Sequence, residues 1–245
     1  MPFAEDRSVL SLASRAPDRE VRYGDDPLHV ADVWNSRPNA GGLLVILIHG
    51  GFWRPAFDRK HLAPVANAIA DAGFTVASVE YRRVPGQPDV TTGDVVDACR
   101  RAPTLLGADR AVVVGHSAGG HLALLCASVV GAPLSVVALA PAASLAMAES
   151  LRLGDGAAAA FLGKPASERR DIDPLELPAP SVPVTIVHGT EDAIVPLSLA
   201  EAYVKKHTAA QLVKVADAGH FAVIDPRTAA WAAVLAEIRR AASSK

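Results

Sequence analysis

The chain has 245 residues, of which half are hydrophobic, and a formal net charge of −2. Its length is sufficient for one large core and fits a single α/β domain, so we expect residues 1–245 to form one domain. Basic and acidic residues are scattered along the chain, which argues against nucleic acid as a partner. Charges interrupt the first 26 positions, which argues against a signal peptide, and we expect a cytoplasmic protein.

Short apolar runs alternate with helical patterns along most of the chain. Several of the runs contain no polar residue, as is typical of strands buried on both faces of a parallel sheet. The predicted strands cover residues 28–34, 43–48, 74–80, 111–114, 134–140, 182–187 and 211–215. The predicted helices cover residues 61–72, 92–106, 119–130, 197–207 and 227–241. This alternation predicts an α/β fold with a doubly wound, mostly parallel sheet.

One stretch has the length of a membrane span. Residues 122–148 carry no charge, but Gly131, Ala132 and Pro133 divide them into a helix and a short strand. We therefore expect no membrane association. The alternation of strands and helices breaks only at residues 141–181, a stretch rich in alanine, proline and charged residues.

The segment Gly115-His116-Ser117-Ala118-Gly119 follows the apolar run at 111–114 and precedes a helical pattern. A serine between a buried strand and a helix lies in a strained turn, and the flanking glycines allow the backbones to approach closely. This context predicts that Ser117 is a nucleophile. A GxSxG pattern alone is a weak signal, so the prediction depends on further residues in the right order.

Three further signals occur in that order. The apolar run at 43–48 ends in His49-Gly50-Gly51-Phe52-Trp53, the run at 182–187 leads to Asp192, and His220 follows the run at 211–215. The order of serine, acid and histidine fits a nucleophile that is activated by a histidine and an acid.

With these motifs the chain resembles the α/β-hydrolases of the esterase and lipase group over about residues 28–240. The form His49-Gly50-Gly51-Phe52-Trp53 is similar to the HGGxW motif of the kynurenine formamidase (arylformamidase) branch, as is GHSAGG at 115–120. The resemblance implies an α/β-hydrolase fold. In this fold an insertion after the strand that follows the nucleophile helix usually covers the active site, so we expect residues 141–181 to form a lid.

The predicted chemistry gives each site residue a role. A serine hydroxyl is a poor nucleophile at neutral pH, so His220 accepts the proton of Ser117 and returns it to the leaving group. Asp192 holds the imidazole in the required tautomer. The negatively charged intermediate needs hydrogen-bond donors, which we predict to be the backbone N–H groups of Gly51, Phe52 and Ala118.

Other acids are weaker candidates for the partner of His220. Asp192 follows a predicted strand by a short loop, and the neighbouring Glu191 is the less favoured substitute. Asp217 and Asp225 lie so near His220 in sequence that they would have to fold back onto their own loop.

The remaining histidines and Trp53 have structural alternatives. His49 and His188 end strands and fit hydrogen bonds between loops better than metal binding, and His116 and His121 are expected to be packing groups beside the nucleophile. The segment His49-Gly50-Gly51-Phe52-Trp53, which holds two of the predicted donors, is called the oxyanion loop below. Trp53 either packs beneath this loop or lines the substrate pocket, and we assign it to substrate binding. No histidine and carboxylate cluster has metal-ligand spacing, and the two cysteines are expected to be free thiols. We expect neither a metal nor a cofactor.

The predicted function is a serine hydrolase that cleaves a small ester or an activated amide through an acyl-enzyme. Carboxylesterase and arylformamidase-like activity are both open, so the expected partner is a small-molecule ester or formamide. One alternative is a serine peptidase related to prolyl oligopeptidases, which the absence of a large propeller-like domain disfavours. The other is a non-catalytic binding protein on the same fold, which the intact set of predicted site residues disfavours.

Overall fold

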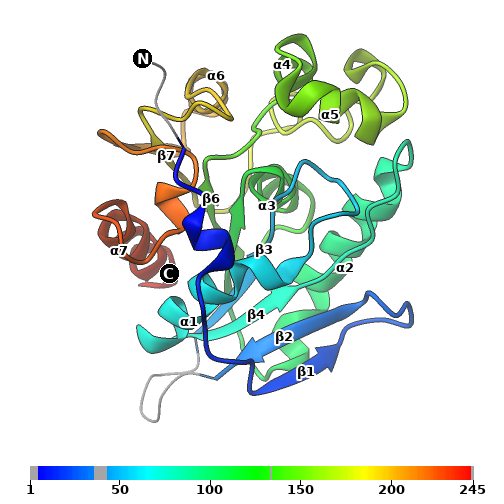
Figure 1. The fold of residues 1–245 in the computed structure, drawn as a ribbon. Coiled ribbons are helices and arrows are strands. Elements are labelled where there is room, and N and C mark those ends of the chain that lie inside the picture. Colours follow the sequence, from blue (N-terminus) through cyan, green and yellow to red (C-terminus); the bar gives the residue numbers. More distant parts are fainter. Residues whose placement is uncertain (1–4, 36–42, 133, 244–245) are drawn as a thin grey trace.

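The computed structural model describes residues 5–35, 43–132 and 134–243 of the chain. Within these ranges eight strands form one sheet in the order β1-β2-β4-β3-β5-β6-β7-β8 (Figure 1). The two strands β1 and β2 run antiparallel to their neighbours, and the other six are parallel to one another. The strands are β1 (Arg19–Arg22), β2 (Val30–Trp34), β3 (Leu44–Ile48), β4 (Thr75–Val79), β5 (Ala111–His116), β6 (Leu134–Leu139), β7 (Val184–Gly189) and β8 (Gln211–Val215).

Helices cover both faces of the sheet, as the alternation predicted. Helices α1 and α7 pack on one face, and α2, α3 and α6 pack on the other (Figure 1). The helices are α1 (Ala63–Asp71), α2 (Pro88–Leu105), α3 (Ala118–Val129), α4 (Leu145–Ser150), α5 (Leu153–Leu162), α6 (Ser198–Lys206) and α7 (Ala230–Ser243), with 3₁₀ helices η1 (Ser8–Ser11), η2 (Arg59–Leu62), η3 (Ala166–Glu168) and η4 (Ala222–Ile224).

The all-apolar strand β3 shows why the sheet is buried on both faces. Leu44, Ile46 and Ile48 point into the core shared with α2, α3 and α6, whereas Val45 and Leu47 point into the core shared with α1 and α7. Successive side chains of a strand alternate between faces, so a strand covered on both sides is apolar at most of its positions.

The sequence patterns did not predict β1, α4 or α5. β1 has the sequence Arg-Glu-Val-Arg and lies at the edge of the sheet, where its charged side chains face solvent and leave no apolar pattern. The helices α4 and α5 occupy part of residues 141–181, and left-handed residues from Arg152 to Gly156 interrupt their helical pattern. In Figure 1 both helices lie beyond one end of the sheet.

The six parallel strands position the candidate site. Their carboxyl ends meet at one edge of the sheet, so the segments that follow β3, β5, β7 and β8 come together there. These segments contain His49, Ser117, Asp192 and His220 respectively. Residues far apart in the chain thus become neighbours through the topology of the sheet.

Candidate active site

Ser117 lies in the turn between β5 and α3, where its backbone has φ 58° and ψ −118°. This conformation costs a residue with a side chain about 1 to 3 kcal/mol, and such strain concentrates at functional sites. The glycines on either side allow the turn to form. A Cβ atom at Gly115 would overlap the carbonyl oxygen of Gly119, and one at Gly119 would overlap that of Ile48.

His220 and Asp192 form a buried pair. The Nδ1 atom of His220 lies 2.7 Å from Oδ2 of Asp192, and both side chains are almost completely excluded from solvent. Because a carboxylate can only accept, Nδ1 carries the proton and Nε2 is the basic nitrogen of the neutral ring. The structure therefore brings together the two residues that the sequence predicted as acid and base, although 28 positions separate them.

The carboxylate of Asp192 is held by three other donors. The backbone N–H groups of Ile194 and Val195 donate to Oδ1 at 2.9 and 2.7 Å, and Nε2 of His188 lies 3.2 Å from Oδ2. Burial acts to raise the pKa of Asp192, but the hydrogen bonds from His188, His220 and Val195 outweigh it and lower the pKa below its ordinary value. Asp192 is thus an anion fixed beside His220.

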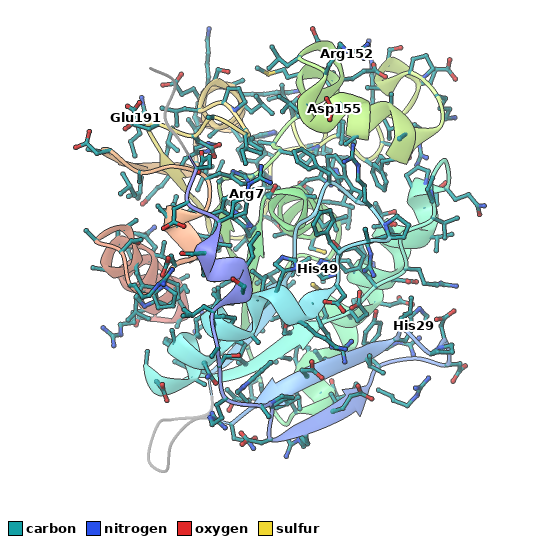
Figure 2. All side chains as sticks on the ribbon, in the orientation of Figure 1. Arg7, His29, His49, Arg152, Asp155 and Glu191 are labelled. Carbon is teal, nitrogen blue, oxygen red and sulfur yellow. The ribbon has the colours of Figure 1, made fainter. Side chains whose placement is uncertain are left out.

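The other acids considered for this role lie elsewhere. Asp225 forms a salt bridge with Arg227 at 2.6 Å, and the backbone N–H of Asp217 donates to the hydroxyl of Thr190. The side chain of Glu191 is exposed and lies at the outer edge of the molecule in Figure 2. Among the described residues only Asp192 is hydrogen-bonded to the His220 ring.

A cavity of about 310 Å³ connects the nucleophile to the histidine. Its wall includes Ser117 and His220 together with Gly51 and Phe52, so four of the predicted site residues line one space. The complete lining is Arg7, Leu10, Gly51, Phe52, Phe57, His61, His116, Ser117, Ile194, His220 and Phe221. No described residue between 141 and 181 belongs to this lining.

The loop after β3 has an unusual backbone. Gly51, Phe52 and Trp53 all have positive φ, at 107°, 54° and 55°. Within the described residues, the N–H groups of Gly51, Phe52 and Ala118 donate to no protein acceptor. Unpaired backbone donors at the wall of a cavity can bind an oxyanion, and Ala118 is also the first residue of a helix, where the dipole favours negative charge.

Buried ionic and polar side chains form hydrogen bonds to the backbone of this loop. The Nδ1 atom of His49 lies 2.8 Å from the carbonyl oxygen of Gly50, and its Nε2 lies 3.2 Å from Oε1 of Glu80. Burial acts to raise the pKa of Glu80, but His49 and Arg83 lower it overall. Tyr81 donates its hydroxyl to the carbonyl oxygen of His49 at 2.8 Å. Figure 2 shows His49 within the molecule, and its hydrogen bonds agree with the loop-tying role that the sequence predicted.

Trp53 does not line the cavity. Its indole is 3% exposed, stacks on Phe161 with ring centroids 4.9 Å apart, and donates from Nε1 to Nδ1 of His121 at 3.3 Å. The other nitrogen of His121 lies 2.9 Å from the carbonyl oxygen of Ile172, which requires its proton to be on Nε2. The structure therefore favours packing beneath the oxyanion loop, one of the two sequence alternatives, over direct contact with substrate.

His116 and His61 complete the histidines around the cavity. Burial, followed by the neighbouring His220, lowers the pKa of His116, whose Nε2 lies 3.0 Å from the carbonyl oxygen of His220. Burial, followed by His49, lowers the pKa of His61 to about 4. Both rings are therefore neutral near pH 7. The packing role predicted for His116 agrees with these contacts, whereas the position of His61 was not predicted.

Sequence patterns also missed the N-terminal segment. Both carboxylate oxygens of Glu5 accept from the backbone N–H of His220, at 2.9 and 2.8 Å, and one also accepts from the N–H of Ala193 at 3.0 Å. Arg7 and Leu10 line the cavity. These contacts span more than 180 positions, so no local motif could have revealed them.

Comparisons with known proteins agree with the geometry. The BD-FAE family model matches residues 35–133, and the model described as TAP-like protein matches residues 155–238. Esterase LipC of Mycobacterium tuberculosis is 25% identical over 225 residues, which cover 77% of this chain and 54% of that protein. The chain thus spans about half the length of this curated relative.

Solved structures show the same fold over most of the chain. A putative thioesterase from Silicibacter sp. TM1040 has a TM-score of 0.72 at 27% identity, covering 89% of this chain and 86% of that one. Esterase B of Lactobacillus rhamnosis has a TM-score of 0.75 at 20% identity, covering 96% and 90%. The chain has the predicted α/β-hydrolase fold, and in sequence it is similar to an esterase and to a putative thioesterase. The narrower assignment to the kynurenine formamidase branch stays a prediction.

No helix in the described ranges combines the length and the apolar character needed to cross a membrane. The uncharged stretch at 122–148 instead contains helix α3, strand β6 and the start of α4. Cys99 and Cys126 are buried free thiols, as the sequence predicted.

Proposed function

We propose that the protein is a serine hydrolase that cleaves small esters through an acyl-enzyme formed on Ser117. One observation carries the proposal: a strained serine at a strand-to-helix turn shares a cavity with a histidine whose Nδ1 is 2.7 Å from a buried carboxylate. These are the three roles that serine-based acyl transfer requires.

The reaction starts with attack of the Ser117 hydroxyl oxygen on the carbonyl carbon of the substrate. The Nε2 atom of His220 takes the hydroxyl proton, and Asp192 stabilises the imidazolium that forms. The same proton then passes to the departing alcohol, which leaves an ester between Ser117 and the acyl group. In the second half, His220 accepts a proton from water as the water oxygen attacks this ester, and it then returns that proton to the oxygen of Ser117 as the acid product leaves.

The tetrahedral intermediate of each half carries a negative oxygen. The backbone N–H groups of Gly51, Phe52 and Ala118 supply the donors, since they have no acceptor among the described residues and lie at the wall of the cavity or directly after the nucleophile. One donor of this kind is worth about 2.7 to 4 kcal/mol of transition-state stabilisation. The positive φ angles of Gly51 and Phe52 support this role because they turn the loop sharply at that point.

Small esters are the first substrate class, supported by the esterases that the chain resembles. An aryl formamide is the second, because three phenylalanines, Phe52, Phe57 and Phe221, line the cavity and suit an aromatic leaving group. Its amide bond makes a heavier demand on His220, which must protonate the departing nitrogen.

Labelling by a fluorophosphonate tests the serine chemistry. We expect Ser117 to be modified and Ser117→Ala to lose about a millionfold in kcat, as loss of a triad serine does in a well-studied protease, while circular dichroism stays unchanged. Ser128→Ala is the matched control, since Ser128 lies in the same helix with its hydroxyl on Pro178. Labelling of a different serine would overturn the proposal, and no labelling or turnover at all would favour a non-catalytic binding protein.

A substrate panel separates the two classes. For a formamidase, kcat/KM for N-formylkynurenine should exceed that for nitrophenyl acetate and fall steeply as the acyl group grows from formyl to butyryl. For a carboxylesterase, acetyl and butyryl esters should be hydrolysed readily and N-formylkynurenine ignored. A chain that cleaves only peptides would support the serine peptidase alternative instead.

A further inference from the structure

The segment formed by residues 5–11, here called the N-terminal strap, is fixed against the candidate site. Glu5 accepts from the backbone N–H groups of Ala193 and His220, and Arg227 donates to the hydroxyl of Ser8 at 2.6 Å. Val9 is completely buried in the core beneath α1 and α7. Three anchors within five residues leave the strap little freedom to move away from the cavity.

Arg7, an exposed residue of the strap, brings a positive charge to the cavity. It is the only arginine, lysine, aspartate or glutamate among the lining residues of the described chain, and the rest of the wall is apolar, aromatic or made of serine and histidine. Its guanidinium carbon lies 5.6 Å from the ring centroid of Phe221, which also lines the cavity. In Figure 2 the side chain of Arg7 extends from the strap toward helix α3, which begins directly after Ser117.

The guanidinium of Arg7 has no acidic partner in the described part of the chain. The two acids beside it in sequence are engaged elsewhere: Glu5 with the backbone of Ala193 and His220, and Asp6 with the N–H of Ser8 at 2.8 Å. A guanidinium offers five N–H donors in a planar fork that matches a carboxylate. The fork of Arg7 is therefore free to bind an anion from outside the chain.

We infer that Arg7 makes the site selective for substrates that carry a carboxylate. This inference rests on the proposed hydrolase function and names the substrate class of the same cavity. The substrate's ester carbonyl lies at Ser117 while its carboxylate lies at Arg7, and the aromatic wall encloses the chain between them. Because the strap holds the backbone of Arg7 and the guanidinium lies over the Phe221 ring, selectivity does not require ordering of a flexible loop.

Two pairs of esters test this with the whole chain. In the first, 3-acetoxybenzoate and 3-acetoxybenzamide place the charge or its neutral counterpart on the leaving group. In the second, monophenyl glutarate and its terminal amide place it on the acyl group. We expect the acid of at least one pair to have a kcat/KM about tenfold higher than its amide, a preference that weakens as salt is raised. The pair that shows it identifies the side of the ester that Arg7 faces.

Variants assign the preference to Arg7. Arg7→Gln should lower the ratio of kcat/KM for the acid to that for the amide about tenfold, chiefly by raising KM for the acid, and Arg7→Lys should retain part of the preference. Arg15→Gln is the control, because Arg15 belongs to the same end of the chain but pairs with Asp18 at 2.6 Å, outside the cavity. Equal rates for acid and amide in both pairs, or a preference that survives in Arg7→Gln, would overturn the inference.

These outcomes stay distinct from failure of the proposed function. A protein that hydrolyses neutral esters and is labelled at Ser117 but ignores the carboxylate refutes only the role of Arg7. A protein that hydrolyses no ester and resists the fluorophosphonate refutes the hydrolase proposal, and the role of Arg7 with it.

Discussion

The N-terminal strap and the insertion at 141–181 approach the candidate site in different ways. The sequence predicted the insertion as the cover, yet Arg7 and Leu10 of the strap line the cavity at Ser117 and no described residue of the insertion does. The strap binds the loops that carry the acid and the histidine, through Glu5. The insertion instead touches the oxyanion loop.

The insertion contacts this loop and also the turn of Ser117, where the backbone N–H of Ala142 donates to the carbonyl oxygen of Ser117 at 3.2 Å. Phe161 stacks on Trp53, and Arg54 donates to the carbonyl oxygen of Gly154. The carbonyl oxygen of Ile172 accepts from His121, which in turn accepts from Trp53. An insertion can therefore influence an active site by holding a loop in place, without forming a wall of the pocket. Its role as a substrate-selecting cover stays a prediction.

The largest expected effect comes from a change in the candidate site itself, at the acid Asp192. Asp192→Asn keeps the shape of the acid but removes the charge that fixes the His220 tautomer, so we expect kcat to fall about 10⁴-fold, as in a serine protease. Asp217→Asn and Asp225→Asn serve as controls and should cost little, because neither carboxylate bonds to His220. All three are measured with one nitrophenyl ester.

Should Asp217→Asn or Asp225→Asn be the crippled variant, the acid would lie on the loop of His220 itself. The strap would then no longer bridge the two loops that carry acid and base, and it would not differ from the insertion in this respect.

Glu5→Gln tests the strap and has the next largest effect. Hydrogen bonds to a charged acceptor contribute about 1.5 to 3 kcal/mol, so we expect kcat to fall about 10- to 100-fold as His220 becomes less well placed. Because Glu5 does not line the cavity, KM should change little, and Glu5→Asp should recover part of the loss. Asp6→Asn is the control on the neighbouring residue. A change in KM alone would mean that the strap contributes to binding and not to the position of His220.

The central strands and the approach of Ser117, Asp192 and His220 to one another could be predicted because their signals are local. β3 and the first five residues of β5 are apolar because both faces are covered, and Ser117 needs glycines two residues away on each side. Asp192 and His220 follow late strands, so their meeting is a consequence of the parallel sheet.

What could not be predicted depends on contacts between distant segments. Glu5 is one acid among several near the N-terminus, and nothing around it in sequence shows that it accepts from His220. Trp53 fits either packing or substrate binding until Phe161 and His121 are placed around it. The left-handed residues near Gly154 hide the helices of the insertion because they break the apolar period.

Trp53→Phe tests the insertion, with a smaller expected effect. It removes the Nε1 donor to His121 but keeps an aromatic ring against Phe161. Loss of one neutral hydrogen bond, worth about 0.5 to 1.5 kcal/mol, should lower kcat about two- to tenfold through the oxyanion loop. Trp34→Phe is the matched control, since its Nε1 donates to the carbonyl oxygen of Arg15, away from the cavity.

Acetyl and butyryl esters should lose activity equally in Trp53→Phe, because the indole does not line the cavity. A loss confined to the bulkier ester would show that the insertion selects the acyl group, as expected if residues 141–181 form a lid.

The smallest effect at neutral pH concerns two buried histidines, one beside the strap and one beside the insertion. His61 lies in η2, which packs against the strap helix η1, and His121 is held by the insertion through Ile172. Burial is the main cause that lowers the pKa of each to about 4.

An unfolded histidine has a pKa of about 6.5, so between about pH 6.5 and 4 the unfolded chain binds protons that the folded chain does not bind. The free energy of unfolding is therefore complete above that window and is lost as the pH falls through it, by about 1.4 kcal/mol per pH unit for each histidine. His61→Gln and His121→Gln should each flatten this slope by that amount in urea titrations at several pH values. If only His121→Gln flattens the slope, the His61 ring is open to protons in the folded protein, and the strap closes its side of the cavity less tightly than the insertion packs beneath the oxyanion loop.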